Sequence, residues 1–275
     1  MNIILIGGCG YIGSKLHAHL VRAKHTVHVI DSEYRGNPAG ISHLRGDYRD
    51  FIRFDADDAV IWLAGHSSVQ RCLDQPWKAF DNNLSGLVRL ARCLEGQPLI
   101  YASSASVYAI KDGRATNMYD YTKAAADEAL RLLYPNSFGL RFGTVCGSSP
   151  NLREELMVNS MVKSAVIDGV VRYRNPTARR PVLDISDLCR GVDQILKGNV
   201  SPGTHNLCSY RDTVAGYAAD TSRSLDVPTE HLPDTPAYNF DMEPAEWFEP
   251  QATIASTIAD LIVHHGERWR ALRSA

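Results

Sequence analysis

The strongest constraint on the fold lies at the start of the chain, where an apolar run ends directly in a cluster of glycines. Residues 3–6 are all apolar, which is typical of a strand that is buried on both faces of a parallel sheet. Gly7, Gly10 and Gly13 follow, and helical periodicity begins at about residue 12. A strand, a glycine turn and a helix in this order predict a phosphate-binding loop, because glycines let backbone N–H groups and the helix N-terminus approach an anion closely.

Strand-like and helical segments alternate through the first half of the chain. The predicted strands cover residues 2–6, 26–30, 59–63, 98–102 and 138–142. The predicted helices cover residues 12–24, 77–94 and 119–133, and in the second of these the apolar side chains from Trp77 to Leu94 share one helical face. The alternation predicts an α/β fold with a doubly wound parallel (Rossmann) sheet in residues 1–147.

The pattern changes after Gly147, where residues 148–151 are typical of a loop. We expect residues 148–275 to form mainly a smaller C-terminal substrate-binding lobe. The chain is predicted to rejoin the sheet over about residues 181–208, with a strand at 181–185 and a helix up to Leu196. Apolar residues at helical spacing then predict a last amphipathic helix, namely Ile254, Ile258, Leu261 and Ile262.

Charge and composition exclude several classes of partner. The 275 residues include 29 Lys and Arg against 31 Asp and Glu, for a net charge of -2. This balance lacks the basic excess that nucleic acid or an anionic membrane attracts. No apolar run is long enough to span a bilayer, and the start of the chain does not resemble a secretory signal, so we expect a cytoplasmic protein. The cysteines are expected to be free thiols, and the histidine pairs are poorly placed to chelate, so no metal site is predicted.

An acidic residue indicates the cofactor. Asp31 closes the second predicted strand, where a carboxylate can accept hydrogen bonds from both hydroxyls of an adenosine ribose and repels a 2′-phosphate. NAD is therefore favoured over NADP, although Arg35 lies nearby. The alternative is a glycine turn that binds nothing.

Tyr119 and Lys123 form a candidate acid–base pair. Their spacing places them one turn apart on the same face of a helix. A neighbouring ammonium would favour the phenolate form of Tyr119, which could then act as a base. The same spacing at Tyr11 and Lys15 is interpreted as coincidence, and the alternative for Tyr119 and Lys123 is a solvated pair.

Ser103, Ser104 and Ser106 follow the predicted strand at 98–102. They would lie at the carboxyl edge of the sheet, where ligands bind in doubly wound folds. One of them could donate a hydrogen bond to a reacting hydroxyl, and the alternative is that they are ordinary turn residues.

Together these motifs resemble, in order along the chain, those of the extended short-chain dehydrogenases/reductases, specifically the NAD-dependent epimerase/dehydratase family of nucleotide-sugar enzymes. The resemblance rests on GGCGYIG at 7–13, GDYRD at 46–50, VIWLAG at 60–65, NLSG at 83–86 and YASSASVY at 101–108, continued by YDYTK, LRFGTVCG and RRPVLDISDL. It implies contacts with NAD from Gly7, Gly10, Tyr11, Ile12, Gly13, Asp31, Ser32, Asp47, Tyr48, Leu63, Ala64, Gly65, Asn83, Tyr119 and Lys123. Asp47 and Tyr48 fall where the family touches adenine.

The resemblance also implies a mechanism of transient oxidation. Ser104, Tyr119 and Lys123 would be the catalytic residues of an epimerase acting on a nucleotide-diphosphate sugar, and NAD would be reduced and reoxidised within one turnover. The implied substrate contacts are Ser104, Ser106, Thr144, Arg172, Arg174 and Arg180. The arginines could equally lie in surface ion pairs.

Departures from the family pattern reduce the number of reactions that this chain is expected to catalyse. Dehydratases of the family usually carry an acidic residue beside the catalytic Ser or Thr, whereas this chain has Ala105 and Ser106 there, so dehydration is disfavoured. Alternatives that stay open are a nucleotide-sugar reductase, a decarboxylase and a non-catalytic NAD-binding sensor. The helices at 77–94 and 119–133 resemble those of the family's dimer interface, so a homodimer is expected.

Overall fold

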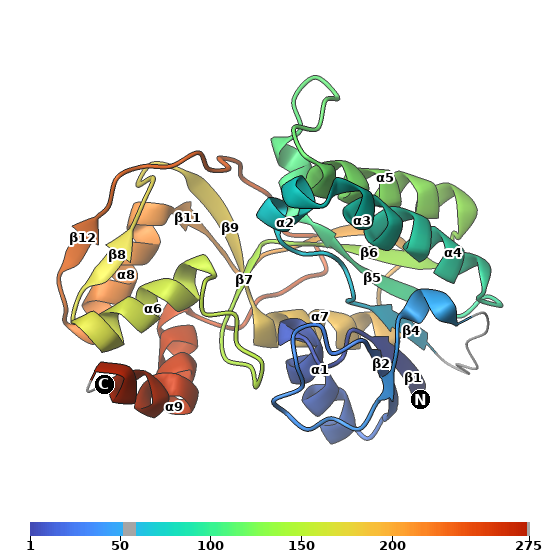
Figure 1. The fold of residues 1–275 in the computed structure, drawn as a ribbon, viewed down its shortest axis with the longest axis horizontal. Coiled ribbons are helices and arrows are strands. Elements are labelled where there is room, and N and C mark those ends of the chain that lie inside the picture. Colours follow the sequence, from blue (N-terminus) through green and yellow to red (C-terminus); the bar gives the residue numbers. More distant parts are fainter. Residues whose placement is uncertain (52–58, 274–275) are drawn as a thin grey trace. The chain divides into compact units, whose positions relative to one another are not determined.

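The computed structural model describes residues 1–51 and 59–273. The chain divides into two compact units, each of which is described by itself (Figure 1). Unit 1 comprises Met1–Arg141, Ser149–Asn151 and Cys189–His205, and unit 2 comprises Phe142–Ser148, Leu152–Leu188 and Asn206–Ala275. The chain therefore passes between the units several times.

Unit 1 is built on a seven-stranded sheet with the order β10-β6-β5-β4-β1-β2-β3. The strands are β1 (Asn2–Ile6), β2 (Thr26–Asp31), β3 (Leu44–Arg45), β4 (Ala59–Trp62), β5 (Leu99–Ser104), β6 (Ser137–Phe142) and β10 (Gly203–Leu207). Strand β1 pairs in parallel with β2 on one side and with β4 on the other. The strand order thus reverses beside β1, which confirms the predicted doubly wound sheet and puts the glycine loop at its topological switch point.

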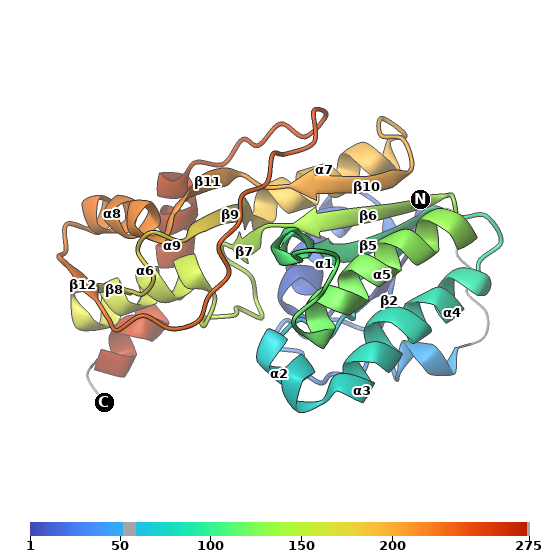
Figure 2. The same cartoon turned by 90° about the horizontal axis from the view of Figure 1, so that it is seen from above.

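Helices cover the sheet because its strands are apolar on both sides. Helices α2 (Val69–Asp74), α3 (Pro76–Phe80), α4 (Gly86–Arg92) and α5 (Met118–Leu133) lie on one face, and α1 (Tyr11–Arg22) and α7 (Ile185–Leu196) lie on the other (Figures 1 and 2). Short 3-10 helices cover Tyr48–Asp50 and Ala105–Ala109. The core between the sheet and α4–α5 includes Ile4, Val60, Trp62, Leu87 and Leu130.

The predicted helix at 77–94 is interrupted. A π-helical segment, Asp81–Ser85, separates α3 from α4. Because a π turn is wider than an α turn, it shifts which residues face the sheet. The prediction that Trp77 lies on the buried face is therefore wrong, since Trp77 is 80% exposed. The interruption instead buries Asn83 completely.

Unit 2 contains two small sheets. One has the order β11-β9-β7 and the other pairs β12 with β8. Its elements are β7 (Thr144–Cys146), α6 (Met157–Asp168), β8 (Val171–Tyr173), β9 (Arg179–Asp184), β11 (Tyr210–Thr213), α8 (Val214–Leu225), β12 (Thr229–His231) and α9 (Ile254–Arg273). Its core gathers Val162, Val182, Tyr217, Leu261 and Trp269.

The strand predicted at 181–185 does not return to the main sheet. It is β9, which pairs in parallel with β7 and antiparallel with β11. The strand that rejoins the main sheet is β10, later in the chain. A local apolar pattern predicts a strand but carries no information about which sheet the strand joins.

Within the described residues, no helix combines the length and apolar character needed to cross a membrane. The same part of the chain holds no cluster of three or more His, Cys, Asp or Glu residues suited to a metal ion. None of the six cysteines, all of which lie in the described ranges, forms a disulfide.

Candidate active site

The glycine loop requires glycine at its first and last positions. Gly7 has a φ of +86°, and a Cβ atom there would lie 2.7 Å from the backbone nitrogen of Ala64. A Cβ atom at Gly13 would lie 2.1 Å from the carbonyl oxygen of Gly7. Gly10, in contrast, is the N-cap of α1, where no side chain caps the helix. The loop is therefore tightly folded beneath an uncapped helix N-terminus that begins at Tyr11 and Ile12, which fits the pyrophosphate of a dinucleotide.

Asp31 lies at the carboxyl end of β2 and orders the loop. One carboxylate oxygen, Oδ2, accepts a hydrogen bond from the backbone N–H of Cys9 at 2.9 Å, and Oδ1 accepts one from Glu33 at 2.7 Å. Because a carboxylate has room for further donors, Asp31 can still bind ribose hydroxyls. Ser32, the next residue, is exposed.

Asp47 and Tyr48 have different environments. Asp47 accepts hydrogen bonds from the backbone N–H and from Nε of Arg49, both at 2.9 Å, and the bond to the Arg49 side chain lowers the pKa of the Asp47 carboxyl. Tyr48 is 4% exposed, and its hydroxyl donates to the carbonyl oxygen of Asn82 at 2.6 Å. The Tyr48 side chain is thus part of the core, which leaves its backbone for any contact with adenine.

The loop after β4, residues 63–66, is held by two neighbouring asparagines. Asn82 donates to the carbonyl oxygen of Ala64 at 2.8 Å. Asn83 accepts from the backbone N–H of His66 at 2.6 Å and donates to its carbonyl oxygen at 3.1 Å. The Asn83 amide therefore positions this loop, which contains Leu63 and Gly65.

Lys123 is buried at the carboxyl edge of the sheet. Its Nζ donates to the carbonyl oxygen of Ala102 on β5 at 2.6 Å, and it lies 5.1 Å from the ring centroid of Trp62 and 5.8 Å from that of Tyr119. A Cβ atom at Gly65 would approach Nζ to 3.0 Å. Burial lowers the pKa of Lys123 to about 8.

Tyr119 and Ser104 come from the two elements that Lys123 joins. Tyr119 is half-buried in the first turn of α5, whose N-cap Asn117 accepts from the backbone N–H of Asp120 at 2.9 Å. Ser104 ends β5; its Oγ donates to Oγ of Ser106 at 3.0 Å and accepts from the Ser106 backbone N–H at 3.1 Å. The structure thus brings Lys123 close to Tyr119 and packs α5 against the strand that carries Ser104.

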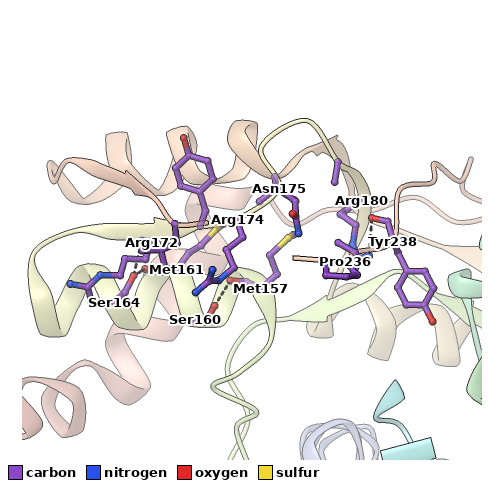
Figure 3. A pocket seen from close by; sticks show the side chains of 15 residues that line it. Met157, Ser160, Met161, Ser164, Arg172, Arg174, Asn175, Arg180, Pro236 and Tyr238 are labelled. Carbon is purple, nitrogen blue, oxygen red and sulfur yellow. Dashed lines mark hydrogen bonds between the residues drawn. The ribbon is translucent and has the colours of Figure 1, made fainter. Parts of the chain in front are cut away.

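Unit 2 has a pocket of about 540 Å³ that the three predicted arginines line. In Figure 3 the side chains around it come from α6, from the segment 171–180 and from residues near Pro236 and Tyr238. Arg180 lies with its Cζ 5.5 Å from the ring centroid of Tyr238 and 5.7 Å from that of Phe240. Burial lowers the pKa of Arg180, and no carboxylate within the described ranges forms an ion pair with it.

The other predicted substrate contacts in unit 2 differ from Arg180. Arg172 forms ion pairs with Asp168 and with Glu230, the latter at 2.8 Å. Arg174 donates to the carbonyl oxygen of Pro233. Thr144, on β7, is half-buried and is absent from the residues that line the pocket.

Sequence reasoning missed the residues that close this pocket from the C-terminal side. Leu232, Pro236, Ala237 and Tyr238 line it. They belong to a proline-bearing stretch without helical or strand periodicity, so only the aromatic character of Tyr238 and Phe240 marked it in the sequence.

Comparison with known proteins identifies the family. Residues 3–208 match the model of the NAD dependent epimerase/dehydratase family. The chain belongs to this family. NAD is accordingly the family's cofactor, in agreement with Asp31 and the glycine loop.

Individual relatives are distant. The chain is 27% identical over 202 residues to a UDP-glucose 4-epimerase of Lactobacillus helveticus, a match that covers 60% of each protein. The chain spans about half the length of the first curated relatives that it matches: 60% of this one, and 46% and 54% of the next two.

Solved structures agree with the fold over nearly the whole chain. UDP-glucose 4-epimerase of Thermotoga maritima, solved with UDP-glucose, superposes with a TM-score of 0.83 over 98% of this chain and 99% of that one, at 16% identity. The Thermus thermophilus enzyme, in complex with NAD, has a TM-score of 0.78 at 20% identity and covers 96% of this chain and 98% of its own. At these identities the likeness concerns the fold.

Proposed function

We propose that this protein is a nucleotide-sugar epimerase that works by transient oxidation of a sugar hydroxyl. The observation that carries the proposal is the buried ammonium of Lys123, held between the Ala102 carbonyl and the Tyr119 ring. Burying a charge is costly unless the charge is used or paired. Its position beside a phenol, at the edge of the sheet where the glycine loop lies, supports a role in catalysis.

Each catalytic side chain has a distinct role in this proposal. Tyr119, as the phenolate, takes the proton from the sugar hydroxyl, and its neighbour Lys123 stabilises the negative charge. Ser104 donates a hydrogen bond to the same sugar oxygen after its single O–H turns away from Ser106. Bound NAD supplies the acceptor and then the donor of the hydride. The keto sugar rotates in the site so that its opposite face receives the hydride. Tyr119 then returns the proton, and one stereocentre is inverted.

The proposed cofactor contacts follow from the loops at the sheet edge. Backbone groups of Gly7 to Gly13, including Tyr11 and Ile12, would hold the pyrophosphate, and Asp31 with Ser32 would hold the adenosine ribose. Asp47 and the backbone of Tyr48 would meet adenine, while Leu63, Ala64 and Gly65 would pass beside the dinucleotide, with Asn83 positioning them.

The pocket in unit 2 is proposed to hold the nucleotide diphosphate. Arg180 is the best candidate for a phosphate contact, because it is mostly buried and free of a carboxylate partner within the described residues, whereas Arg172 is neutralised by two. Arg174 is a second candidate. Ser106 and Thr144 remain proposed sugar contacts.

Epimerisation is proposed over dehydration because of the residues that follow Ser104. Elimination of water needs an acid close to the reacting carbon. Ala105 and Ser106 supply none, and the Ser106 hydroxyl is already bonded to Ser104.

The test starts with the purified protein. Denaturation should release NAD, and incubation of the native protein with UDP-, GDP- and dTDP-hexoses should give inverted sugars without added NAD, followed by NMR of the anomeric protons. Net consumption of NADH would instead indicate a reductase, release of CO₂ from a nucleotide hexuronic acid a decarboxylase, and no reaction with any sugar a sensor. Each of these three outcomes would contradict the proposal.

We also propose that two copies of the chain pair through α3 and α5. Trp77 on α3 is 80% exposed and Tyr121 on α5 is 47% exposed, and Leu73 on the neighbouring helix α2 is 52% exposed. Large apolar side chains exposed together on neighbouring helices favour association with a second copy.

A further inference from the structure

A contact in unit 1 joins the loop after β2 to helix α2, which follows β4. Tyr34 lies in the loop after β2, and Arg71 lies in α2, after β4. Nη1 of Arg71 donates to the Tyr34 hydroxyl at 2.9 Å, and Cζ of Arg71 lies 5.2 Å from the Tyr34 ring centroid. The ring of His66 lies 6.4 Å from that of Tyr34. The same two side chains are thus joined by a hydrogen bond and a cation–π contact.

The strand order puts the glycine turn between the segments that follow β2 and β4. In the sequence β4-β1-β2, the strand β1 lies between the two strands whose loops meet. The glycine loop continues β1 at the same edge of the sheet. A bond from the β2 side to the β4 side therefore joins the two segments that flank residues 7–13.

The loop that carries Tyr34 is fixed to the glycine loop at its base. The side-chain amide of Asn151 donates to the carbonyl oxygens of Cys9 and of Arg35, at 2.8 Å and 3.2 Å. Asp31 binds the backbone N–H of Cys9 from the other side. Tyr34 is nevertheless 65% exposed at the tip. The base of the loop is thus anchored while its tip is held mainly by Arg71.

The contact also carries positive charge. No carboxylate of the described part of the chain forms an ion pair with Arg71, and Tyr34 engages only one of its N–H donors. Burial, and then the charges of Arg71, Lys78 and Arg35, lower the pKa of His66. Cationic groups thus gather here although the whole chain has a net charge of -2.

We propose that Arg71 binds the pyrophosphate of the dinucleotide and that Tyr34 holds Arg71 over the glycine loop. An arginine with donors to spare, next to a glycine turn, matches the geometry of a diphosphate. Entry and release of the cofactor then require the contact between Tyr34 and Arg71 to open. The proposal depends on the family's cofactor and not on the reaction with sugars, so it can fail or succeed independently of the epimerase assignment.

The experiment measures binding of NAD, ADP and adenosine to cofactor-free protein by calorimetry, together with the rate of NAD release after dilution. Arg71→Gln is expected to raise the Kd for NAD and ADP by about tenfold to a hundredfold, because a charge-assisted bond is lost, and to leave the Kd for adenosine unchanged. Arg71→Lys should recover part of the affinity, since lysine keeps the charge but lacks the planar fork. Tyr34→Phe should speed NAD release by a few-fold with a smaller change in Kd.

Arg131→Gln is the matched control, because Arg131 is an exposed arginine of unit 1 that pairs with Glu128. The melting temperatures of the cofactor-free variants should equal that of the wild type, so that changes in Kd report binding. The proposal would be supported if Arg71→Gln bound NAD and ADP more weakly than the wild type but bound adenosine equally well. Added salt should also weaken NAD binding less in this variant than in the wild type. Wild-type affinity of Arg71→Gln for ADP, or an equal loss for ADP and adenosine, would overturn it.

Discussion

Lys123 of unit 1 and Arg172 of unit 2 illustrate two different environments of a positive charge. Lys123, in unit 1, is 3% exposed and donates to a backbone carbonyl beside a phenol. Arg172, in unit 2, is more exposed and is neutralised by Asp168 and Glu230. Both were candidate site residues from the sequence. Of the two, only Lys123 is buried without a carboxylate salt bridge among the described residues, and a purely structural role gives no reason for such an environment.

The difference reflects how the two predictions were made. Lys123 was assigned from its spacing to Tyr119, and helical spacing alone ensures that the two side chains share a face. Arg172 is a candidate only because the family resemblance implies a phosphate contact from a basic residue in this region. A basic side chain near the surface finds a carboxylate partner easily, and such a pair contributes little to stability. Spacing on one element, together with a position near the carboxyl edge of the sheet, is therefore a stronger basis for a site than residue type.

The largest expected effect is on the chemistry of unit 1. Tyr119→Phe removes the proposed base, and kcat should fall about a thousandfold, since a positioned acid–base group contributes about 10²–10⁴-fold. NAD content should stay at the wild-type level, because the phenol does not hold the dinucleotide by itself. Steady-state kinetics and assay of NAD released on denaturation check both. A variant with unchanged kcat would exclude Tyr119 as the base.

Lys123→Met tests whether the ammonium is buried in solution. Because burial lowers the pKa of Lys123 to about 8, the unfolded chain, with an ordinary lysine pKa of about 10.4, binds more protons than the folded chain between these values. The stability of the wild type therefore rises with pH through this window. The variant lacks the titrating group, so its free energy of unfolding should exceed that of the wild type at pH 7 by up to about 3 kcal/mol, less the lost bond to Ala102.

Urea unfolding of the cofactor-free proteins at pH 7 and at pH 10 provides the measurement. The difference between the variant and the wild type should shrink at the higher pH. If the variant and the wild type differed in free energy of unfolding by the same amount at both pH values, Lys123 would be solvated. The contrast between Lys123 and the exposed Arg172 would then disappear.

An effect of intermediate size is expected on dimer formation through the exposed helices of unit 1. Trp77→Glu places a charge where a second copy is proposed to bind, and the dimer should dissociate about 30-fold more readily, in line with about 2 kcal/mol for a central tryptophan. Analytical ultracentrifugation measures the change. Leu272→Glu, at an exposed position on α9 of unit 2, is the control and should leave the association unchanged; a monomeric wild type would rule the interface out.

The smallest expected effect is a change in KM that distinguishes two arginines of the same pocket, Arg180 and Arg172. Arg180→Met should raise the KM for the nucleotide sugar about tenfold, because a charge-assisted contact to phosphate is lost. Arg172→Gln should change KM less than about twofold, since its charge is already neutralised. Equal effects of the two substitutions would show that partner carboxylates do not decide which arginine meets the substrate.

Much of unit 1 was predictable because its signals are local. Strand β1 and helix α1 lie within two residues of their predicted limits, and β5 extends the predicted strand only through Ser103 and Ser104. The exposure of Trp77 was not predictable, because the π turn at Asp81–Ser85 has no signature in the apolar pattern. The place of β9 was equally hidden, since it depends on pairing with β7 and β11, which lie elsewhere in the chain.

The sequence by itself determined the glycine turn after β1, the carboxylate that ends β2 and the shared helical face of Tyr119 and Lys123, because each depends on neighbours within a few residues. Only the tertiary structure decided that Lys123 is buried against Ala102, that Arg172 is neutralised by Glu230, and that Tyr34 meets Arg71. These contacts join groups far apart in the chain, and their energies depend on the burial that packing creates.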